Sequence, residues 1–306
     1  MRNAFADEIL KIAMADSRVV LLSGDIGNRL FDKMKATLPN RFFNCGVAEA
    51  NMISMAAGLA ASGFRPVCYT IAPFVTSRCF EQIKIDLCYH RVPAIIVGTG
   101  SGLSYASLGA THHSFEDLAL LRSLPEMHVI APADANELRS ALRWAATQSG
   151  PSYLRIGKKG EPVLTAPDVD FQPDTWTRMR EGSDAILLSC GTILPEVLAA
   201  ADLLIASGLR VGVWNCAGVK PLDESALASL PPGPVFTVEE HSILGGFGSA
   251  VAEFFSASGK PRAVYRLGIP DHFLHDCGEQ TEARIHCGID GASIATKVQT
   301  VLDTKW

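Results

Sequence analysis

The stretch RFFNCGVAEANMISMAAGLAASGF, residues 41–64, is the part of the chain whose pattern most constrains the fold. Its segment 48–61 has almost no polar face, which predicts a helix that is buried on nearly all sides. Glu49 is the only acidic residue of the stretch, and an ionised carboxylate in apolar surroundings is costly unless it has a partner. Two explanations are open here: the first turn of a helix tolerates an acid, or Glu49 has a functional role.

Short apolar runs alternate with helical patterns along the chain. The first series of predicted strands comprises 18–25, 65–72, 92–100, 127–134 and 151–156. A second series comprises 184–191, 209–216, 233–240 and 262–269, with a helix over 195–207. The strands are continuously apolar rather than alternating, so both faces of each sheet must be covered, which is typical of parallel α/β sheets.

The periodic pattern lapses between 157 and 182, where Pro, Asp and Lys are frequent. This interruption predicts a domain boundary. We therefore expect an α/β protein with two three-layer α/β/α domains and mainly parallel sheets, spanning 1–165 and 183–306 and joined by a linker over 166–182.

Composition narrows the classes of function. The 306 residues carry a net charge of -5 with no basic run, which argues against nucleic acid as a partner. The first residues do not resemble a signal peptide, and no apolar run approaches the roughly 18 residues that span a bilayer. The eight Cys show no C-x-x-C spacing, so neither a zinc site nor a disulfide framework is indicated. We expect a cytoplasmic protein with reduced thiols, no metal ligands of its own and no membrane contact.

Two further segments carry candidate polar residues. LLSGDIGNR ends a predicted strand at Asp25, where ligands bind in open α/β sheets, although plain turn chemistry also explains it. GATHHSFED places His112 and His113 in a loop. A loop histidine beside a strand end suits proton transfer, and a surface histidine without a role is the alternative.

Taken together, five motifs resemble the C-terminal half of transketolase and of 1-deoxyxylulose-5-phosphate synthase. They are GVAEANMISMAAGLAASGFRPV, FEQIKID, GATHHSFEDLALLRSLPEMHVIAPAD, GPSYLRIGKKG and EEHSILGGFGSAVAE, and they cover nearly the whole chain in order. The resemblance implies a thiamine diphosphate pyrimidine-binding domain followed by a transketolase C-terminal domain. The family's third domain, which binds the diphosphate and Mg²⁺ through a G-D-G motif, has no counterpart here.

That missing domain implies a partner. In the family, thiamine diphosphate lies across a subunit interface, so this chain would hold only the pyrimidine end. The resemblance therefore implies a companion chain that supplies the diphosphate and Mg²⁺ site, an α2β2 assembly, and self-association through this chain.

The resemblance also assigns cofactor-binding roles. Glu49 matches the glutamate that bonds the pyrimidine N1′ and favours the imino tautomer, and we expect its apolar setting to raise its pKa. Asp25 and Ile26 match a strand-end pair beside the cofactor. Phe74 is predicted to stack on the pyrimidine, with Phe80 as the alternative; without the family, each would be read as core.

Substrate contacts are carried over in the same way. His112, with Thr111 before it, matches the histidine that contacts the reacting oxygens, which makes His112 the second catalytic candidate besides Glu49. The positions that align near the sugar phosphate are Arg2, Arg29, Arg155 and Lys158, for which solvated surface cations are the alternative.

Several positions depart from the family pattern. Lys158 stands where the family has Arg, so a bidentate phosphate clamp becomes a point charge. His113 replaces a Gln, Leu108 replaces an Asp that recognises a substrate hydroxyl, and the loop's earlier histidine is missing from GTGSG. These departures predict a less hydroxylated or specialised sugar.

Three functions follow from these patterns. The first is transfer of a two-carbon ketol unit between sugars, with phosphorylated sugars as the expected class. The second is the β subunit of a 2-oxoacid dehydrogenase or a related decarboxylating synthase, which shares this layout. The third is a degenerate subunit that only scaffolds its partner, and the presence of Glu49 argues against it.

Overall fold

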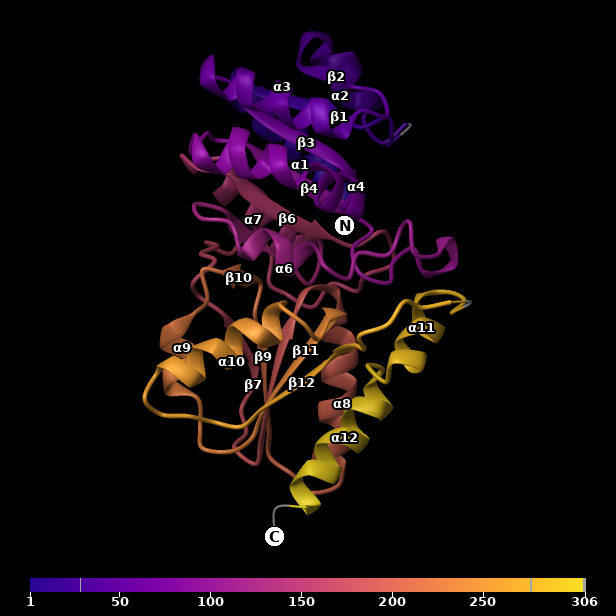
Figure 1. Ribbon diagram of the computed structural model, residues 1–306, viewed down its shortest axis with the longest axis vertical. Helices are drawn as coiled ribbons and strands as arrows, with labels where there is room; N and C mark the ends of the chain where they lie inside the picture. The colour runs from indigo at the N-terminus through magenta and orange to yellow at the C-terminus, as the bar shows by residue number, and fades with distance from the viewer. Residues whose placement is uncertain (28, 276, 305–306) are drawn as a thin grey trace. The chain divides into compact units, whose positions relative to one another are not determined.

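A computed structural model describes residues 1–27, 29–275 and 277–304 (Figure 1). The chain divides into two compact units. The first unit combines Met1–Ser101 with Leu120–Gln172, and the second combines Gly102–Ala119 with Pro173–Trp306. The loop that carries Thr111 and His112 therefore packs with the second unit, although it lies between two strands of the first in sequence.

The first unit is built on a parallel sheet. Its strands are β1 (Val19–Ser23), β2 (Phe42–Asn44), β3 (Arg65–Ile71), β4 (Ile95–Thr99), β5 (His128–Ile130) and β6 (Ser152–Ile156). They lie in the order β5-β6-β4-β3-β1-β2, and every pair is parallel. β1, β4 and β6 are buried along their whole length, as the continuous apolar runs predicted.

Helices of this unit cover the sheet. They are α1 (Arg2–Ala15), α2 (Asp32–Thr37), α3 (Glu49–Ala61), α4 (Ala72–Val75), α5 (Phe80–Gln82) and α7 (Ala135–Ala145), with 3-10 turns at Pro39–Arg41 (η1) and Ser77–Cys79 (η2) and a π-helix at Ile83–Tyr89 (η3). α3 packs on β3 and on η3, and α1 packs on α7. α6 (Asp117–Arg122) contains the point where the chain passes from the second unit to the first.

The second unit is a mixed sheet with helices around it. Its strands are β7 (Thr177–Arg180), β8 (Ala185–Cys190), β9 (Val211–Asn215), β11 (Val235–Ser242) and β12 (Val264–Ile269), in the order β12-β11-β8-β9-β7. β7 is antiparallel to β9, and the other pairs are parallel. The remaining elements are η4 (Ala106–Leu108), η5 (Gly191–Ile193), α8 (Leu194–Ala206), β10 (Gly218–Lys220), α9 (Glu224–Ser229), α10 (Phe247–Ala257), α11 (Gln280–Cys287) and α12 (Gly291–Asp303). α12 packs along α8 (Figure 1).

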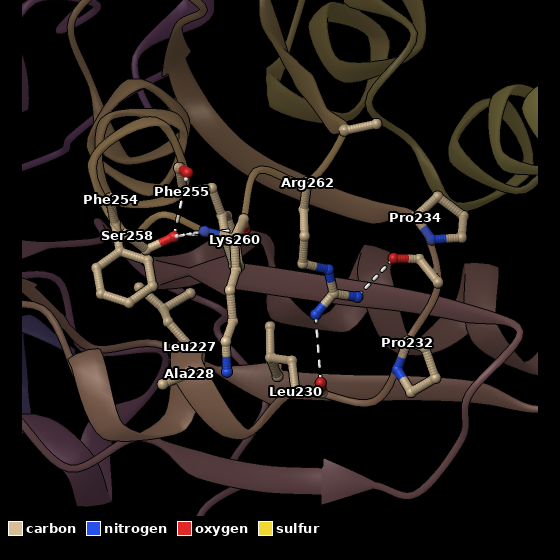
Figure 2. Close-up of a pocket in the computed structure, with 12 residues that line it drawn as sticks. Leu227, Ala228, Leu230, Pro232, Pro234, Phe254, Phe255, Ser258, Lys260 and Arg262 are labelled. Carbon is tan, nitrogen blue, oxygen red and sulfur yellow. Dashed lines mark hydrogen bonds between the residues drawn. The ribbon is translucent and has the colours of Figure 1, made fainter.

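A hollow of about 670 Å³ lies in the second unit beside α9 and α10 (Figure 2). Its walls are mostly apolar, with Leu227, Phe254 and Phe255 among them, and Lys260 and Arg262 are its cationic residues. The guanidinium of Arg262 donates to the carbonyls of residues 230, 231 and 233, so this arginine holds the 230–233 turn in place.

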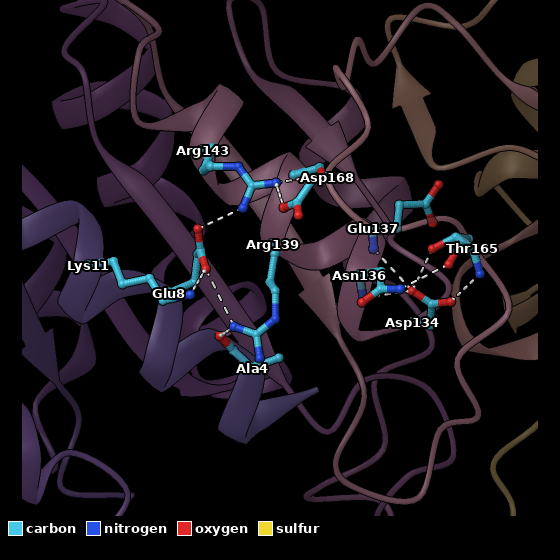
Figure 3. A network of polar contacts seen from close by, with 11 residues as sticks. Ala4, Glu8, Lys11, Asp134, Asn136, Glu137, Arg139, Arg143, Thr165 and Asp168 are labelled. Atoms are coloured by element: carbon cyan, nitrogen blue, oxygen red, sulfur yellow. Dashed lines mark hydrogen bonds and ion pairs between the residues drawn. The ribbon is translucent and has the colours of Figure 1, made fainter.

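Polar networks tie α1 and α7 together in the first unit (Figure 3). Glu8 is buried on α1, and its carboxylate accepts from Arg143 at 2.8 Å and from Arg139 at 3.4 Å. Asp134 begins α7, where its side chain accepts from the backbone of Asn136 and also from the N–H of Thr165 at 2.7 Å. Glu8 therefore joins α1 to α7, and Asp134 joins the beginning of α7 to residues 164 and 165.

The predicted fold class is confirmed: both sheets are mainly parallel and are flanked by helices. The predicted helix over 48–61 is α3, and the predicted helix over 195–207 is α8.

Strands β2, β7 and β10 were not predicted. β2 is short and largely exposed, β7 is an exposed edge strand inside the segment taken as a linker, and β10 has only three residues. The division after Gln172 lies inside the linker predicted over 166–182, whereas the grouping of Gly102–Ala119 with the second unit was not predicted.

We predict that Glu8→Gln lowers the free energy of unfolding at pH 7 by about 1.5–3 kcal/mol, the range for hydrogen bonds to charged groups. Burial alone would raise the pKa of the Glu8 carboxyl, but bonds and charges from Arg143 and Lys11 outweigh burial and lower it below 4.5. Its stabilising contribution is therefore complete above pH 4.5 and is lost as the pH falls through the lowered folded pKa. Urea unfolding at several pH values measures this difference.

Asp7→Asn is the matched control for Glu8→Gln, because Asp7 is half exposed and reaches Arg139 only at 3.9 Å. We expect this control to change the unfolding free energy by less than about 0.5 kcal/mol, as exposed pairs do. Equal losses in the two variants at pH 7 would contradict the role assigned to the buried carboxylate.

Candidate functional site

Glu49 is the first residue of α3, and its side chain is only 3% exposed. The helix dipole favours an acid at this position, so the structural explanation of its placement holds. The dipole is not its only partner, because Arg78 donates from Nη1 to Glu49 Oε2 at 2.9 Å. The Arg78 side chain is 46% exposed, so the buried carboxylate is reached by a cation from the solvent side.

Arg78 also lies over the ring of Phe74, with its guanidinium carbon 4.3 Å from the ring centroid. One guanidinium therefore contacts both the predicted catalytic acid and the predicted stacking aromatic. Arg78 thus links Phe74 with Glu49, and the alternative aromatic, Phe80, is the first residue of α5. The sequence pattern did not predict Arg78, although a lone carboxylate in an apolar stretch requires a nearby cation.

The carboxyl ends of β1 and β3 border the Glu49 side chain. A Cβ at Gly24 would lie 3.0 Å from Thr70 Oγ1 and 3.4 Å from Glu49 Cγ, so only glycine leaves this corner open. The Thr70 hydroxyl is fully buried and has no hydrogen-bond partner among the described residues. Such a group is costly to bury unless a ligand or water satisfies it.

Cys79 lies close enough to Glu49 to be affected by its charge. Burial raises the pKa of the Cys79 thiol to about 12, and the negative charge of Glu49 contributes to the rise while Arg78 opposes it. Cys79 is therefore a neutral thiol at physiological pH. All eight cysteines are free, and only Cys45 and Cys277 are not fully buried.

Asp25 and Ile26 lie on the turn that follows β1. Asp25 adopts a left-handed conformation, with φ of 56°, and accepts from Asn44 Nδ2 at 2.8 Å. The carbonyl of Ile26 accepts from Ser23 Oγ at 2.8 Å. These bonds shape the turn at the same edge of the sheet as Glu49, since β1 and β3 are neighbours in the sheet.

The predicted phosphate-binding cations lie in two places, one around the end of β6 and one on the turn after β1. Arg2 Nε donates to the carbonyl of Lys158 at 2.9 Å, which joins the start of α1 to the segment after β6. Arg155 is on β6 and only 2% exposed, so it is not a solvated surface cation. Arg29 is exposed on the turn after β1, and β3 and β4 separate that strand from β6.

Thr111 and His112 belong to the second unit, within the 102–119 loop. The Thr111 hydroxyl lies 2.9 Å from His112 Nδ1, and the ring of Tyr105 meets the imidazole edge-on at 5.9 Å between centroids. Desolvation lowers the pKa of His112 below 6.5, and the neighbouring His113 lowers it further. His112 is therefore a neutral, half-buried imidazole at neutral pH.

His113 plays a different part from its neighbour. Its side chain is 4% exposed, its Nε2 lies 3.0 Å from the carbonyl of Ala106, and its ring stacks on Phe115 at 4.9 Å. These contacts make His113 a structural residue of the loop.

The EEHS segment at the end of β11 is also structural. Glu239 accepts from the backbone N–H groups of Phe247 and Gly248 at 2.7 and 2.8 Å, so its carboxylate binds the N-terminus of α10. His241 is fully buried between the carbonyl of Ser242 and the N–H of Ala119. Both ring nitrogens of His241 therefore contact backbone groups.

Two absences apply to residues 1–27, 29–275 and 277–304. No group of three or more His, Cys, Asp or Glu side chains is arranged to hold a metal ion. None of the helices in these ranges has both the length and the apolar character to cross a bilayer.

Family models match both units. The model described as "Transketolase, pyrimidine binding domain" matches residues 1–161, and the one described as "Transketolase, C-terminal domain" matches 174–294. An apulose-4-phosphate transketolase subunit of Actinobacillus succinogenes is 37% identical over 258 residues, which cover 84% of this chain and 83% of that protein. A putative transketolase C-terminal section of Methanocaldococcus jannaschii is 33% identical over 97% of this chain and 95% of that protein.

Longer relatives match only in part. 1-Deoxy-D-xylulose-5-phosphate synthase of Thermomicrobium roseum is 36% identical over 99% of this chain, which spans 49% of that enzyme.

A solved structure described as a split gene transketolase, inactive β4 tetramer, is 36% identical and superposes with a TM-score of 0.88 over 100% of this chain and 98% of that one. With two transketolase models covering both units and a relative that is 37% identical over 84% of this chain, the chain belongs to the transketolase family.

Proposed function

We propose that this chain is the β-type subunit of a split, thiamine diphosphate-dependent transketolase, which transfers a two-carbon ketol unit between sugars. The observation that carries the proposal is the buried Glu49 carboxylate, which lies beside Gly24 and the Thr70 hydroxyl and is linked by Arg78 to the Phe74 ring. The match along most of the chain to relatives named as a transketolase subunit and as a transketolase C-terminal section supports the split arrangement.

The residues of this corner fit the aminopyrimidine end of thiamine diphosphate. Glu49 would hold a proton shared with a ring nitrogen, Phe74 would support a flat ring, and the buried Thr70 hydroxyl would gain a partner. Asp25 and Ile26 would shape the adjoining turn. When bound, the cofactor supplies the carbon nucleophile that accepts and donates the ketol unit.

We assign the diphosphate and Mg²⁺ to a companion chain. The described residues of this chain offer no carboxylate or imidazole cluster for a metal ion, and they include no G-D-G sequence. We propose an α2β2 assembly that associates through this chain and in which the companion chain supplies the diphosphate and Mg²⁺ site; the relative described as an inactive β4 tetramer supports self-association.

We place the enzyme in the cytoplasm, because eight free thiols suit a reducing compartment.

His112 and Thr111 are proposed to contact the reacting oxygens of the sugar. A neutral imidazole both donates and accepts hydrogen bonds, which suits proton movement between carbonyl and hydroxyl oxygens. Arg2, Arg155 and Lys158 are proposed to bind a sugar phosphate around the end of β6, and Arg29 would act from the turn after β1.

The substrate is proposed to be a specialised sugar phosphate. Leu108, where the family pattern has Asp, is 52% exposed in the His112 loop and offers no hydrogen bond to a hydroxyl. Relatives named for apulose 4-phosphate make that sugar a rational member of any substrate panel. The match to 1-deoxy-D-xylulose-5-phosphate synthase favours, as a second candidate, a decarboxylating synthase that would take a 2-oxo acid as donor.

The first test combines this chain with its companion chain, thiamine diphosphate and Mg²⁺. We expect ketol transfer from at least one ketose phosphate of a panel that includes apulose 4-phosphate, and no transfer from either chain alone. Carbon dioxide release from pyruvate would identify the synthase instead. Full activity of this chain without its companion would refute the split-site proposal.

We predict that Glu49→Gln lowers kcat of the assembled enzyme by about 10² to 10⁴-fold, because the amide cannot share a proton with the pyrimidine. Glu81→Gln, at an exposed position of α5, is the matched control and is expected to keep kcat within twofold. Steady-state kinetics at saturating thiamine diphosphate separates these cases. An unchanged kcat in Glu49→Gln would remove the catalytic assignment.

We predict that kcat/KM falls on the acid side only below pH 6.5, because the lowered pKa of His112 keeps it neutral down to that pH. Protonation at lower pH removes the acceptor nitrogen, and His112→Asn is expected to lower kcat/KM and to abolish this acid limb. The exposed His90→Asn variant serves as control and should retain the limb. An acid limb that persists in His112→Asn would assign the titration to another group.

A further inference from the structure

Glu240 is a buried acid to which the mechanism above gives no role. It lies near the end of β11, next to the helix-capping Glu239, and its side chain is 1% exposed. A buried ionised carboxylate is retained only where several groups compensate for its desolvation. Its partners therefore show which parts of the second unit this charge joins.

Three elements meet at the Glu240 carboxylate. Oε1 accepts from the backbone N–H of Leu103 at 2.6 Å and from Gln280 Nε2 at 2.9 Å, and Oε2 accepts from Arg284 Nε at 2.6 Å. Leu103 is near the beginning of the 102–119 loop, whereas Gln280 and Arg284 are on α11. The carboxylate thus bridges the Thr111–His112 loop to a helix close to the C-terminus.

The loop is shaped to come this close. Gly102 has φ of +61°, and a Cβ there would lie 2.6 Å from both the carbonyl oxygen and Oε1 of Glu240. Ser114 N–H donates to the carbonyl of Gly102 at 3.2 Å, and Ser242 N–H donates to the carbonyl of Phe115 at 2.9 Å. Both ends of segment 102–115 are therefore attached at the end of β11.

Arg284 anchors the other side of the bridge. Its Nη1 donates to Glu196 and its Nη2 to the carbonyl of Thr192, both at 3.3 Å, and Glu196 also accepts from Gly291 N–H at 2.9 Å. Burial alone would lower the pKa of this guanidinium, but Glu240 and Glu196 outweigh burial and raise it. The cation therefore stays charged, and it connects the loop to α8 and α12.

We propose that Glu240 is a positioning residue, which with Arg284 holds the 102–115 segment so that Thr111 and His112 meet the sugar in a fixed orientation. This inference rests on the proposed function, which supplies the sugar substrate. The attachment of the loop to α11 does not depend on that function. The C-terminal unit thereby has a specific part in the reaction, beyond packing.

Glu240→Gln is the sharpest variant. The carboxylate accepts with both oxygens, but an amide has one acceptor, so Gln must leave either the Leu103 N–H or Arg284 without its partner. Glu240→Ala removes the contacts with Leu103, Gln280 and Arg284 and is expected to have the larger effect. Asp184→Asn is the control, because Asp184 forms an exposed pair with Arg210 elsewhere in the same unit.

Two measurements decide the proposal. Hydrogen exchange of the full chain is expected to speed up at least fivefold in segment 102–115 of Glu240→Gln, with exchange in α10 unchanged. In the assembled enzyme, kcat is expected to fall about tenfold, while the dissociation constant of thiamine diphosphate stays within twofold, because Glu49 and its neighbours lie in the other unit. Asp184→Asn should match the wild type in both measurements.

The opposite results overturn the proposal. Unchanged exchange in 102–115 would show that Glu240 does not hold the loop, and unchanged kcat would show that its hold does not matter for the reaction. Loss of thiamine diphosphate affinity in parallel with kcat would show general damage instead of positioning. A wild-type assembly without ketol transfer would refute the proposed function, and the exchange experiment would still decide whether Glu240 holds the loop.

Discussion

The ion pair between Glu49 and Arg78 is the constraint around which the first unit is organised. A carboxylate that is 3% exposed at the start of an apolar helix needs compensation, and the α3 dipole and one guanidinium provide it. The same guanidinium lies on the Phe74 ring, so the acid and the aromatic are held in one cluster although 25 positions separate them in sequence. Glycine at position 24 keeps the neighbouring strand end close to that cluster.

The second unit also buries ionisable side chains, and there they join structural elements to one another. Glu239, Glu240 and His241 are consecutive, and each is buried at the end of β11. Glu239 holds the N-terminus of α10, Glu240 joins the 102–119 loop to α11, and His241 joins α6 to the strand. These three residues could be mistaken for a catalytic cluster, but each one connects elements of the fold. The proposed substrate contacts are instead Thr111 and His112 in the 102–119 loop.

Much of the fold and part of the site could be predicted from local pattern. Buried strands such as β1 and β6 and apolar helices such as α3 and α8 have signals contained within a few residues. β2 and β7 lacked that signal because both are mostly exposed, and β7 pairs at a sheet edge. The site residue Arg78 was not predicted because it is an ordinary arginine in sequence, and its importance comes only from Glu49, 29 positions away.

The sequence by itself determined the α/β class, the position of a lone acid in an apolar helix, and the motifs of the transketolase family, because these depend on short-range patterns of residue type. Only the tertiary structure decided which groups compensate for each buried charge. Glu240 finds its partners 137 and 44 positions away, at Leu103 and Arg284, and the 102–119 loop joins the second unit through such contacts. Electrostatic compensation depends on distance in space, and the folded chain sets that distance.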